Sequence, residues 1–95
     1  MYRQEELDRL DAEYFHIIIA EPGDVTVMSK CTGHVWKMRC IETPDRRYTV
    51  IQHKHRAEDN YHVHGQRKTL GMAISSIKNH DAFELNGRRP VRKQK

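Results

Sequence analysis

The segment HVWKMRCIETPDRRYTVIQHKH, residues 34–55, decides the fold because it reads as two strands joined by a tight turn. Its two halves alternate apolar and polar side chains with the period of a β-strand. The residues between them, Thr43–Arg46, are typical of a turn. A turn centred on the Pro-Asp pair places Trp36 opposite His53, so the segment predicts an antiparallel hairpin of defined register.

This register divides the side chains of the hairpin between two faces, because residues i and i+2 of a strand point the same way. The apolar face is predicted to pack under the helices and holds Trp36, Met38, Cys40 and Ile51. The other face mixes aromatic, aliphatic and basic side chains. Its candidate nucleic-acid-binding residues are Lys37, Arg39, Tyr48, Gln52 and Lys54. A slip of one residue would bury two of these cations, which favours the stated register.

Turn signals and hydrophobic spacing predict further strands around the hairpin and a helix near each end. The predicted strands cover residues 15–20, 25–30, 34–42, 47–55 and 60–65. The predicted helices cover residues 3–14 and about 68–80. Thr69 is the expected N-cap of the second helix, and Phe83 and Leu85 are expected to pack back on the core after it.

The short connections between these strands exclude parallel crossovers. We therefore predict an α+β fold: an antiparallel four- to five-stranded meander sheet, with an N-terminal helix and a C-terminal helix packed on one face. Residues 1–87 are expected to form a single domain. Residues 88–95 are rich in arginine and lysine and are expected to be a basic flexible tail.

Charge is distributed unevenly along the 95 residues, whose formal net charge is +4. Residues 1–24 hold two bases and seven acids, a net of −5, whereas residues 25–95 hold fifteen bases and six acids, a net of +9. Such a basic body favours nucleic acid or an acidic protein as a partner. The alternative is that the charge serves solubility alone.

The predicted outer face of the sheet and the tail offer the contacts that nucleic acid needs. Lysines and arginines would meet phosphates, Tyr48 could stack on an unpaired base, and Gln52 could read a base edge. The tail would add Arg88, Arg89, Arg92 and Lys93. The alternative interpretation is a polar face that meets only water.

Histidine occurs in two His-x-His pairs, and the candidate metal ligands are His53, His55, His62 and His64. A four-residue turn over residues 56–59 would place His53 opposite His62, so that the pairs share one face. His34, Cys31 or Cys40 could add a ligand to a zinc or copper site. The alternative is that these histidines are structural, since the chain holds no Cys-x-x-Cys or His-Glu-x-x-His motif.

No set of residues forms a recognised catalytic constellation, although His53 or His62 could be a base and Cys31 or Cys40 a nucleophile. We predict a small non-enzymatic binding protein without a cofactor, whose leading partner is nucleic acid or an acidic protein. A protein–protein interaction module, which could be homodimeric, is the first alternative. A His-rich metal-binding protein, with zinc as a possible cofactor, is the second.

The expected location is the cytoplasm, with reduced thiols and no membrane partner. The chain has two cysteines, an acidic rather than apolar opening segment, and a longest apolar run, Ile17–Ala20, of four residues. A membrane-spanning helix needs about 20 apolar residues.

Overall fold

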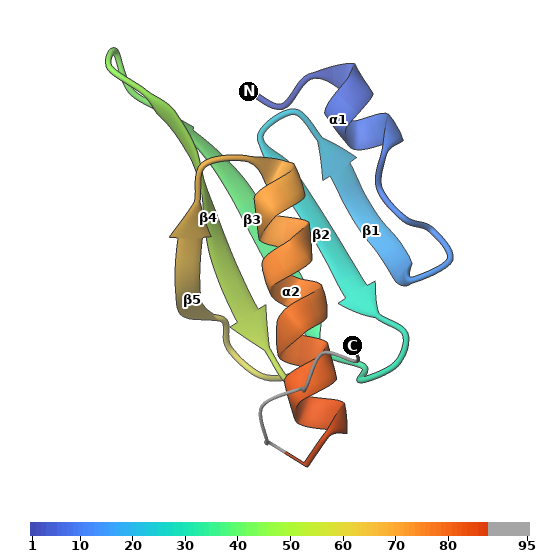
Figure 1. The fold of residues 1–95 in the computed structure, drawn as a ribbon. Coiled ribbons are helices and arrows are strands. Elements are labelled where there is room, and N and C mark those ends of the chain that lie inside the picture. Colours follow the sequence, from blue (N-terminus) through green and yellow to red (C-terminus); the bar gives the residue numbers. More distant parts are fainter. Residues whose placement is uncertain (88–95) are drawn as a thin grey trace, which may run out of the picture.

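The computed structural model describes residues 1–87 and confirms the predicted α+β class (Figure 1). A five-stranded antiparallel sheet runs in the order β1-β2-β3-β4-β5, so each strand pairs with the next one along the chain. The strands are β1 (Phe15–Glu21), β2 (Asp24–Ser29), β3 (Val35–Glu42), β4 (Arg47–Lys54) and β5 (His62–Arg67). The helices are α1 (Gln4–Asp8) and α2 (Leu70–Leu85).

The register predicted for the central hairpin is confirmed at every pair from Val35–Lys54 to Glu42–Arg47. Thr43 closes the turn because its Oγ1 accepts a hydrogen bond from the Arg46 backbone N–H at 3.1 Å. The predicted pairing of His53 with His62 is also present in the β4–β5 hairpin. The turn chemistry and the alternation of side chains thus fix which residues meet across the sheet.

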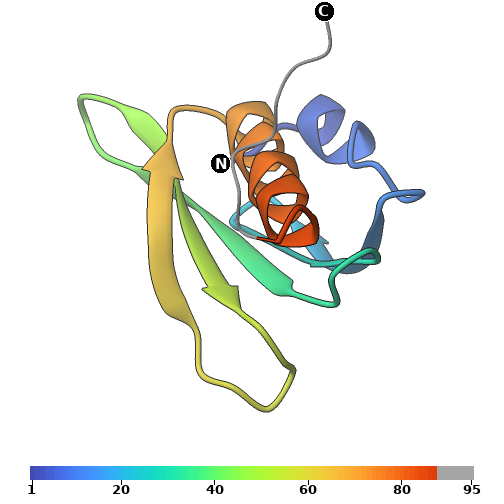
Figure 2. The ribbon, with the colours of Figure 1, turned by 60° about the horizontal axis from the view of Figure 1, so that its bottom comes forward.

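The core lies between the sheet and α2, and both helices cover the same face (Figure 2). Trp36, Met38 and Ile51 are fully buried there, as predicted, against the apolar stripe of α2 that includes Ala73 and Ile77. Fully burying an aliphatic or aromatic side chain of this size contributes roughly 1.5–3 kcal/mol. Within residues 1–87, neither helix is long and apolar enough to cross a membrane.

The prediction of a first helix over residues 3–14 is wrong beyond Asp8, where α1 ends. Downstream, the Asp11 carboxylate accepts hydrogen bonds from the backbone N–H groups of Glu13 and Tyr14, both at 3.1 Å. Such local bonds between a side chain and the backbone compete with helix formation. The apolar spacing of this segment therefore reflects packing on the core rather than a continuous helix.

The second helix is longer than predicted, since it continues to Leu85. Thr69 is its N-cap, as predicted, and its side chain accepts a hydrogen bond from the Met72 N–H at 3.1 Å. Buried Asp81 anchors the extra turns by accepting hydrogen bonds from Tyr14 Oη at 2.7 Å and Thr32 Oγ1 at 3.2 Å. Leu85 is 63% exposed, so its predicted packing on the core is wrong.

Both edge strands contain a bulge. In β1 the register shifts between Ile17 and Ile19. In β5, Gln52 pairs with Val63 whereas Ile51 pairs with Gly65, so His64 is the extra residue. Bulges increase the local twist and make an edge strand a poorer template for pairing with another chain.

Candidate metal centre

Six of the seven histidines gather on the helix side of the sheet, around His53 at the centre of the group. The ring centroids of the other five lie 4.9–5.8 Å from that of His53. We call this group the histidine cluster; it consists of His34, His53, His55, His62, His64 and His80. The seventh, His16, lies in β1 at the opposite edge of the sheet.

His53 is held on several sides and is only 2% exposed. Its Nε2 lies 3.0 Å from His34 Nδ1, and its Nδ1 lies 3.3 Å from His62 Nε2. Trp36 stacks on its ring with a centroid separation of 3.9 Å and an interplanar angle of 21°. The ring therefore has little freedom to rotate or flip.

His34 and His80 approach the central ring from two further elements. His34 precedes β3 and is fixed by its backbone, since its carbonyl accepts from the Ser29 N–H at 2.9 Å and its N–H donates to Thr32 Oγ1 at 3.2 Å. His80 lies on α2, where Ile77 one turn earlier is fully buried. Helical spacing thus directs His80 toward the sheet.

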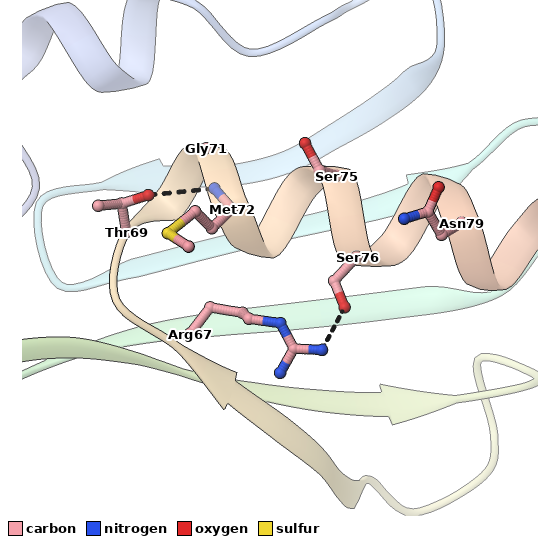
Figure 3. A pocket seen from close by; sticks show the side chains of 7 residues that line it. All are labelled: Arg67, Thr69, Gly71, Met72, Ser75, Ser76 and Asn79. Carbon is pink, nitrogen blue, oxygen red and sulfur yellow. Dashed lines mark hydrogen bonds between the residues drawn. The ribbon is translucent and has the colours of Figure 1, made fainter.

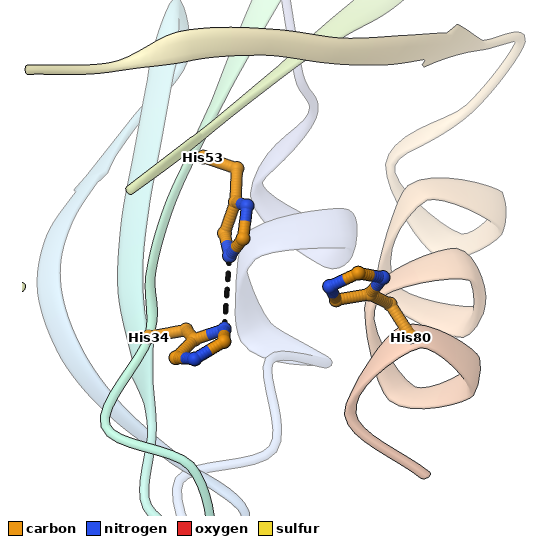
Figure 4. Close-up of side chains that lie close together, drawn as sticks. All are labelled: His34, His53 and His80. Carbon is orange, nitrogen blue, oxygen red and sulfur yellow. Dashed lines mark hydrogen bonds between the residues drawn. The ribbon is translucent and has the colours of Figure 1, made fainter. Parts of the chain in front are cut away.

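One ring nitrogen from each of His34, His53 and His80 lies within 4.8 Å of the other two (Figure 4). We call these three residues the histidine trio. A metal ion bound to imidazole nitrogens at 2.0–2.1 Å holds tetrahedral neighbours roughly 3.3 Å apart. The His34–His53 pair, at 3.0 Å, is already near this spacing, so a small movement of His80 would complete a three-nitrogen site.

One ring nitrogen of His80, Nε2, is buried without a hydrogen-bond partner within the described residues. The ring of His80 reaches from α2 toward the other two residues of the trio (Figure 4). Buried polar atoms are nearly always satisfied in folded proteins, so an unsatisfied one is a marker of function or of a bound group.

Burial lowers the pKa of three histidines of the cluster and so favours their neutral form. Desolvation, reinforced by the neighbouring imidazoles of His34 and His80, lowers the pKa of His53 to about 3. Desolvation also lowers the pKa of half-buried His34 and, on the side of its ring that faces the cluster, that of His64. Since a metal ion binds only the unprotonated imidazole nitrogen, these groups need not lose a proton before they coordinate.

Two carboxylates of α2, those of Asp81 and Glu84, lie near the trio. Glu84 Oε1 lies 3.7 Å from His80 Nε2. Both Glu84 and the buried Asp81 act on His34 as negative charges that oppose the lowering of its pKa. Their charge would offset that of a divalent cation, whose own field dominates such a site.

The structure distributes the predicted metal ligands between the trio and its rim. His53 belongs to the trio, whereas His55, His62 and His64 surround it and are exposed. Neither Cys31, which is exposed, nor the buried Cys40 belongs to the convergent group. The sequence reasoning did not identify His80, although its position three residues after Ile77 on an apolar stripe was a usable signal.

The predicted nucleic-acid-binding residues of the hairpin share the outer face, as the register requires. Lys37 is paired with Asp24 at 2.6 Å, and Lys54 Nζ donates to the Ala57 carbonyl at 3.0 Å. The Arg46 guanidinium lies 4.3 Å from the centroid of the Tyr48 ring. Arg39 is exposed and Gln52 is half-buried. The predicted tail residues Arg88, Arg89, Arg92 and Lys93 lie outside the described residues.

Two surface hollows accompany these sites. A cavity of about 400 Å³ borders the histidine cluster and is lined by Lys54, His55, Asp59, Asn60 and His62. A second groove runs beside α2, where Arg67 donates to Ser76 Oγ at 3.0 Å (Figure 3). Of these two, the first contains imidazoles of the histidine cluster, those of His55 and His62.

Comparison of the chain with protein-family models, curated proteins and solved structures finds no match.

Proposed function

We propose that this protein binds a late first-row transition-metal ion, Zn²⁺ or Cu²⁺, through His34, His53 and His80. The observation that carries the proposal is the convergence of three ring nitrogens within 4.8 Å. Imidazole suits zinc, copper, iron and nickel, whereas magnesium and calcium prefer oxygen ligands. Among these ions, copper stands at the peak of the divalent affinity series, and zinc is bound by three histidines in known catalytic sites.

The donor set leaves one position of a tetrahedral ion free. Sites with three protein ligands usually carry a water molecule or an exogenous ligand in the fourth position. We propose that the ion enters beside the cavity lined by His55 and His62, two members of the histidine cluster. An ion that enters by this route would bind His34 just before β3, His53 in β4 and His80 in α2. It would thereby link the helix to the sheet.

Binding is tested on protein purified without an affinity tag and stripped of metal. Zn²⁺, Cu²⁺ and Mg²⁺ are titrated, and binding is followed by calorimetry. The fluorescence of Trp36 is a second readout, because Trp36 is the sole tryptophan and stacks on His53. We expect one tightly bound Zn²⁺ or Cu²⁺ per chain and no response to Mg²⁺. His80→Gln should weaken binding strongly, and His16→Gln, outside the histidine cluster, should not. Absence of zinc and copper binding by the wild-type chain would refute the proposal.

Nucleic-acid binding through the outer face is the second candidate. Its support is that Lys37, Arg39 and Lys54 lie on one face with Tyr48 and Gln52, in a body of net charge +9 over residues 25–95. It ranks second because Lys37 and Lys54 already have partners within the chain. Binding of single-stranded and duplex oligonucleotides at low and high salt tests it, and we expect affinity to fall steeply with salt. No binding at low salt would exclude it.

A further inference from the structure

His53 can offer an ion only one of its two ring nitrogens. Its Nε2 is the one that faces His34, 3.0 Å away, and therefore the one that faces the trio. A neutral imidazole carries one proton, so coordination through Nε2 requires that proton to be on Nδ1. In the metal-bound protein, His53 Nδ1–H must consequently donate a hydrogen bond or remain buried without an acceptor.

We infer that His62 is a positioning residue that accepts this hydrogen bond and so presents Nε2 of His53 to the ion. The inference rests on the proposed metal site. His62 Nε2 lies 3.3 Å from His53 Nδ1, and the two residues are direct partners across the β4–β5 ladder. Backbone pairing therefore sets their approach, independently of any ion.

Trp36 completes the positioning of His53. Its ring stacks on one face of the imidazole at 3.9 Å, which disfavours the flip that would exchange Nδ1 and Nε2. Metal-bound histidines almost always donate their other N–H to an acceptor that fixes tautomer and ring orientation, and loss of that acceptor costs about 10–100-fold in metal affinity. Here the acceptor is the imidazole of His62 on edge strand β5. This imidazole also lines the cavity beside the cluster.

The test compares wild type with His62→Gln, whose side-chain amide oxygen can accept the same bond, and with His62→Leu, which cannot. His16→Leu is the matched control, because it makes the same change at an exposed histidine on the opposite edge strand, outside the histidine cluster. Zinc affinity is measured by competition with a chelator. Imidazole ¹⁵N–¹H correlation spectra of the zinc-loaded protein report which nitrogen of His53 holds the proton.

We expect His62→Leu to lower zinc affinity about 10–100-fold, with loss of the protected Nδ1–H signal of His53. His62→Gln should recover most of the affinity and the signal, and His16→Leu should leave both near wild type. Unchanged zinc affinity and an unchanged His53 Nδ1–H signal in His62→Leu would overturn the role of His62 while leaving the metal site intact. A wild-type chain that binds no zinc would instead overturn both.

Backbone amide spectra of each metal-free variant establish that it is folded. If His62→Leu does not fold, His62→Asn takes its place. The Asn side chain is one methylene shorter than that of Gln, so its amide is expected to stop short of His53. The same affinity loss and loss of the Nδ1–H signal are then expected for His62→Asn alone. Equal zinc affinity in the two amide variants would contradict the inference.

Discussion

The two faces of the hairpin β3–β4 differ in how completely their polar groups are satisfied. On the outer face, Lys37 and Lys54 are engaged by a carboxylate and a carbonyl of the same chain. On the helix side, three imidazoles converge and His80 Nε2 is buried without a hydrogen-bond partner within residues 1–87. Both faces hold side chains that could bind a partner, but only the second keeps polar atoms buried in a state that a ligand would complete.

The net charge of the sequence and the burial of its histidines indicate different faces of the sheet as the binding site. Net charge indicates the outer face and residues 88–95, because these parts of the sequence are rich in lysine and arginine. Burial directs attention to the helix side, where desolvation lowers the pKa of His53 and holds the ring neutral. Groups with strongly perturbed pKa values in a cluster are better indicators of a site than an evenly solvated charged surface.

The largest expected effect comes from Trp36, which belongs to the core and to the support of His53. Trp36→Ala should lower the free energy of unfolding by about 3–5 kcal/mol, because it leaves a cavity under α2. On the outer face, Tyr48→Ala should cost about 1 kcal/mol or less. Urea unfolding followed by circular dichroism measures both. Similar losses for the two variants would erase the contrast between the faces.

A smaller effect is expected from the ion itself. Zinc at 100 times its dissociation constant should raise the free energy of unfolding by about 2.7 kcal/mol, because the ion binds only the folded chain. Thermal unfolding with and without zinc measures the gain. His80→Gln should abolish most of it and His16→Gln none. A gain that survives His80→Gln would place the ion elsewhere.

Acid should weaken the metal-free fold through His53. As the pH falls below about 6.5 the unfolded chain binds a proton at this residue, whereas the folded chain does so only near pH 3, since the pKa of buried His53 is lowered to about 3. The free energy of unfolding should therefore decrease from pH 6.5 toward pH 3, by up to about 1.4 kcal/mol per pH unit for this group.

Urea unfolding in chelator-containing buffer at several pH values measures this slope. His53→Asn removes the titrating group and should flatten the slope, while His16→Gln should leave it unchanged. Stability that stays constant or rises on acidification of the wild type would contradict the buried, neutral state of His53.

The smallest effect is expected on the outer face. Lys37 and Asp24 are partly exposed and pair at 2.6 Å, and pairs of this kind contribute roughly 0–1 kcal/mol. A double-mutant cycle with Lys37→Met and Asp24→Asn measures the coupling, which should also fall as salt is added. A coupling of several kcal/mol would mean that this face is organised more tightly than its exposure suggests.

Local sequence features were sufficient to predict the register of β3 with β4 and the pairing of His53 with His62, but not the bulges in β1 and β5. The alternation around Thr43–Arg46 fixes the β3–β4 register, and the length of the turn before His62 brings that residue opposite His53. The trio could not be predicted in the same way. His80 meets His53 only because α2 packs at a particular position along the sheet, and that position depends on contacts distant in sequence, such as Asp81 with Tyr14 and Thr32.

The same distinction explains the two errors in the helices. Apolar spacing suggested a helix through residue 14, but α1 ends at Asp8, and Asp11 accepts hydrogen bonds from the backbone of Glu13 and Tyr14 in a separate turn. Spacing also suggested that α2 ends near His80, whereas the buried Asp81 extends it. In both segments an aspartate makes specific hydrogen bonds that the apolar pattern does not reveal.

The most direct test of the central claim is X-ray absorption spectroscopy of the protein loaded with one equivalent of Zn²⁺. We predict a first shell of nitrogen or oxygen at 2.0–2.1 Å, with the outer-shell scattering of about three imidazoles, and the loss of one imidazole in His80→Gln. A sulfur shell at about 2.3 Å, or a shell of oxygen without imidazole scattering, would contradict the histidine trio as the metal site.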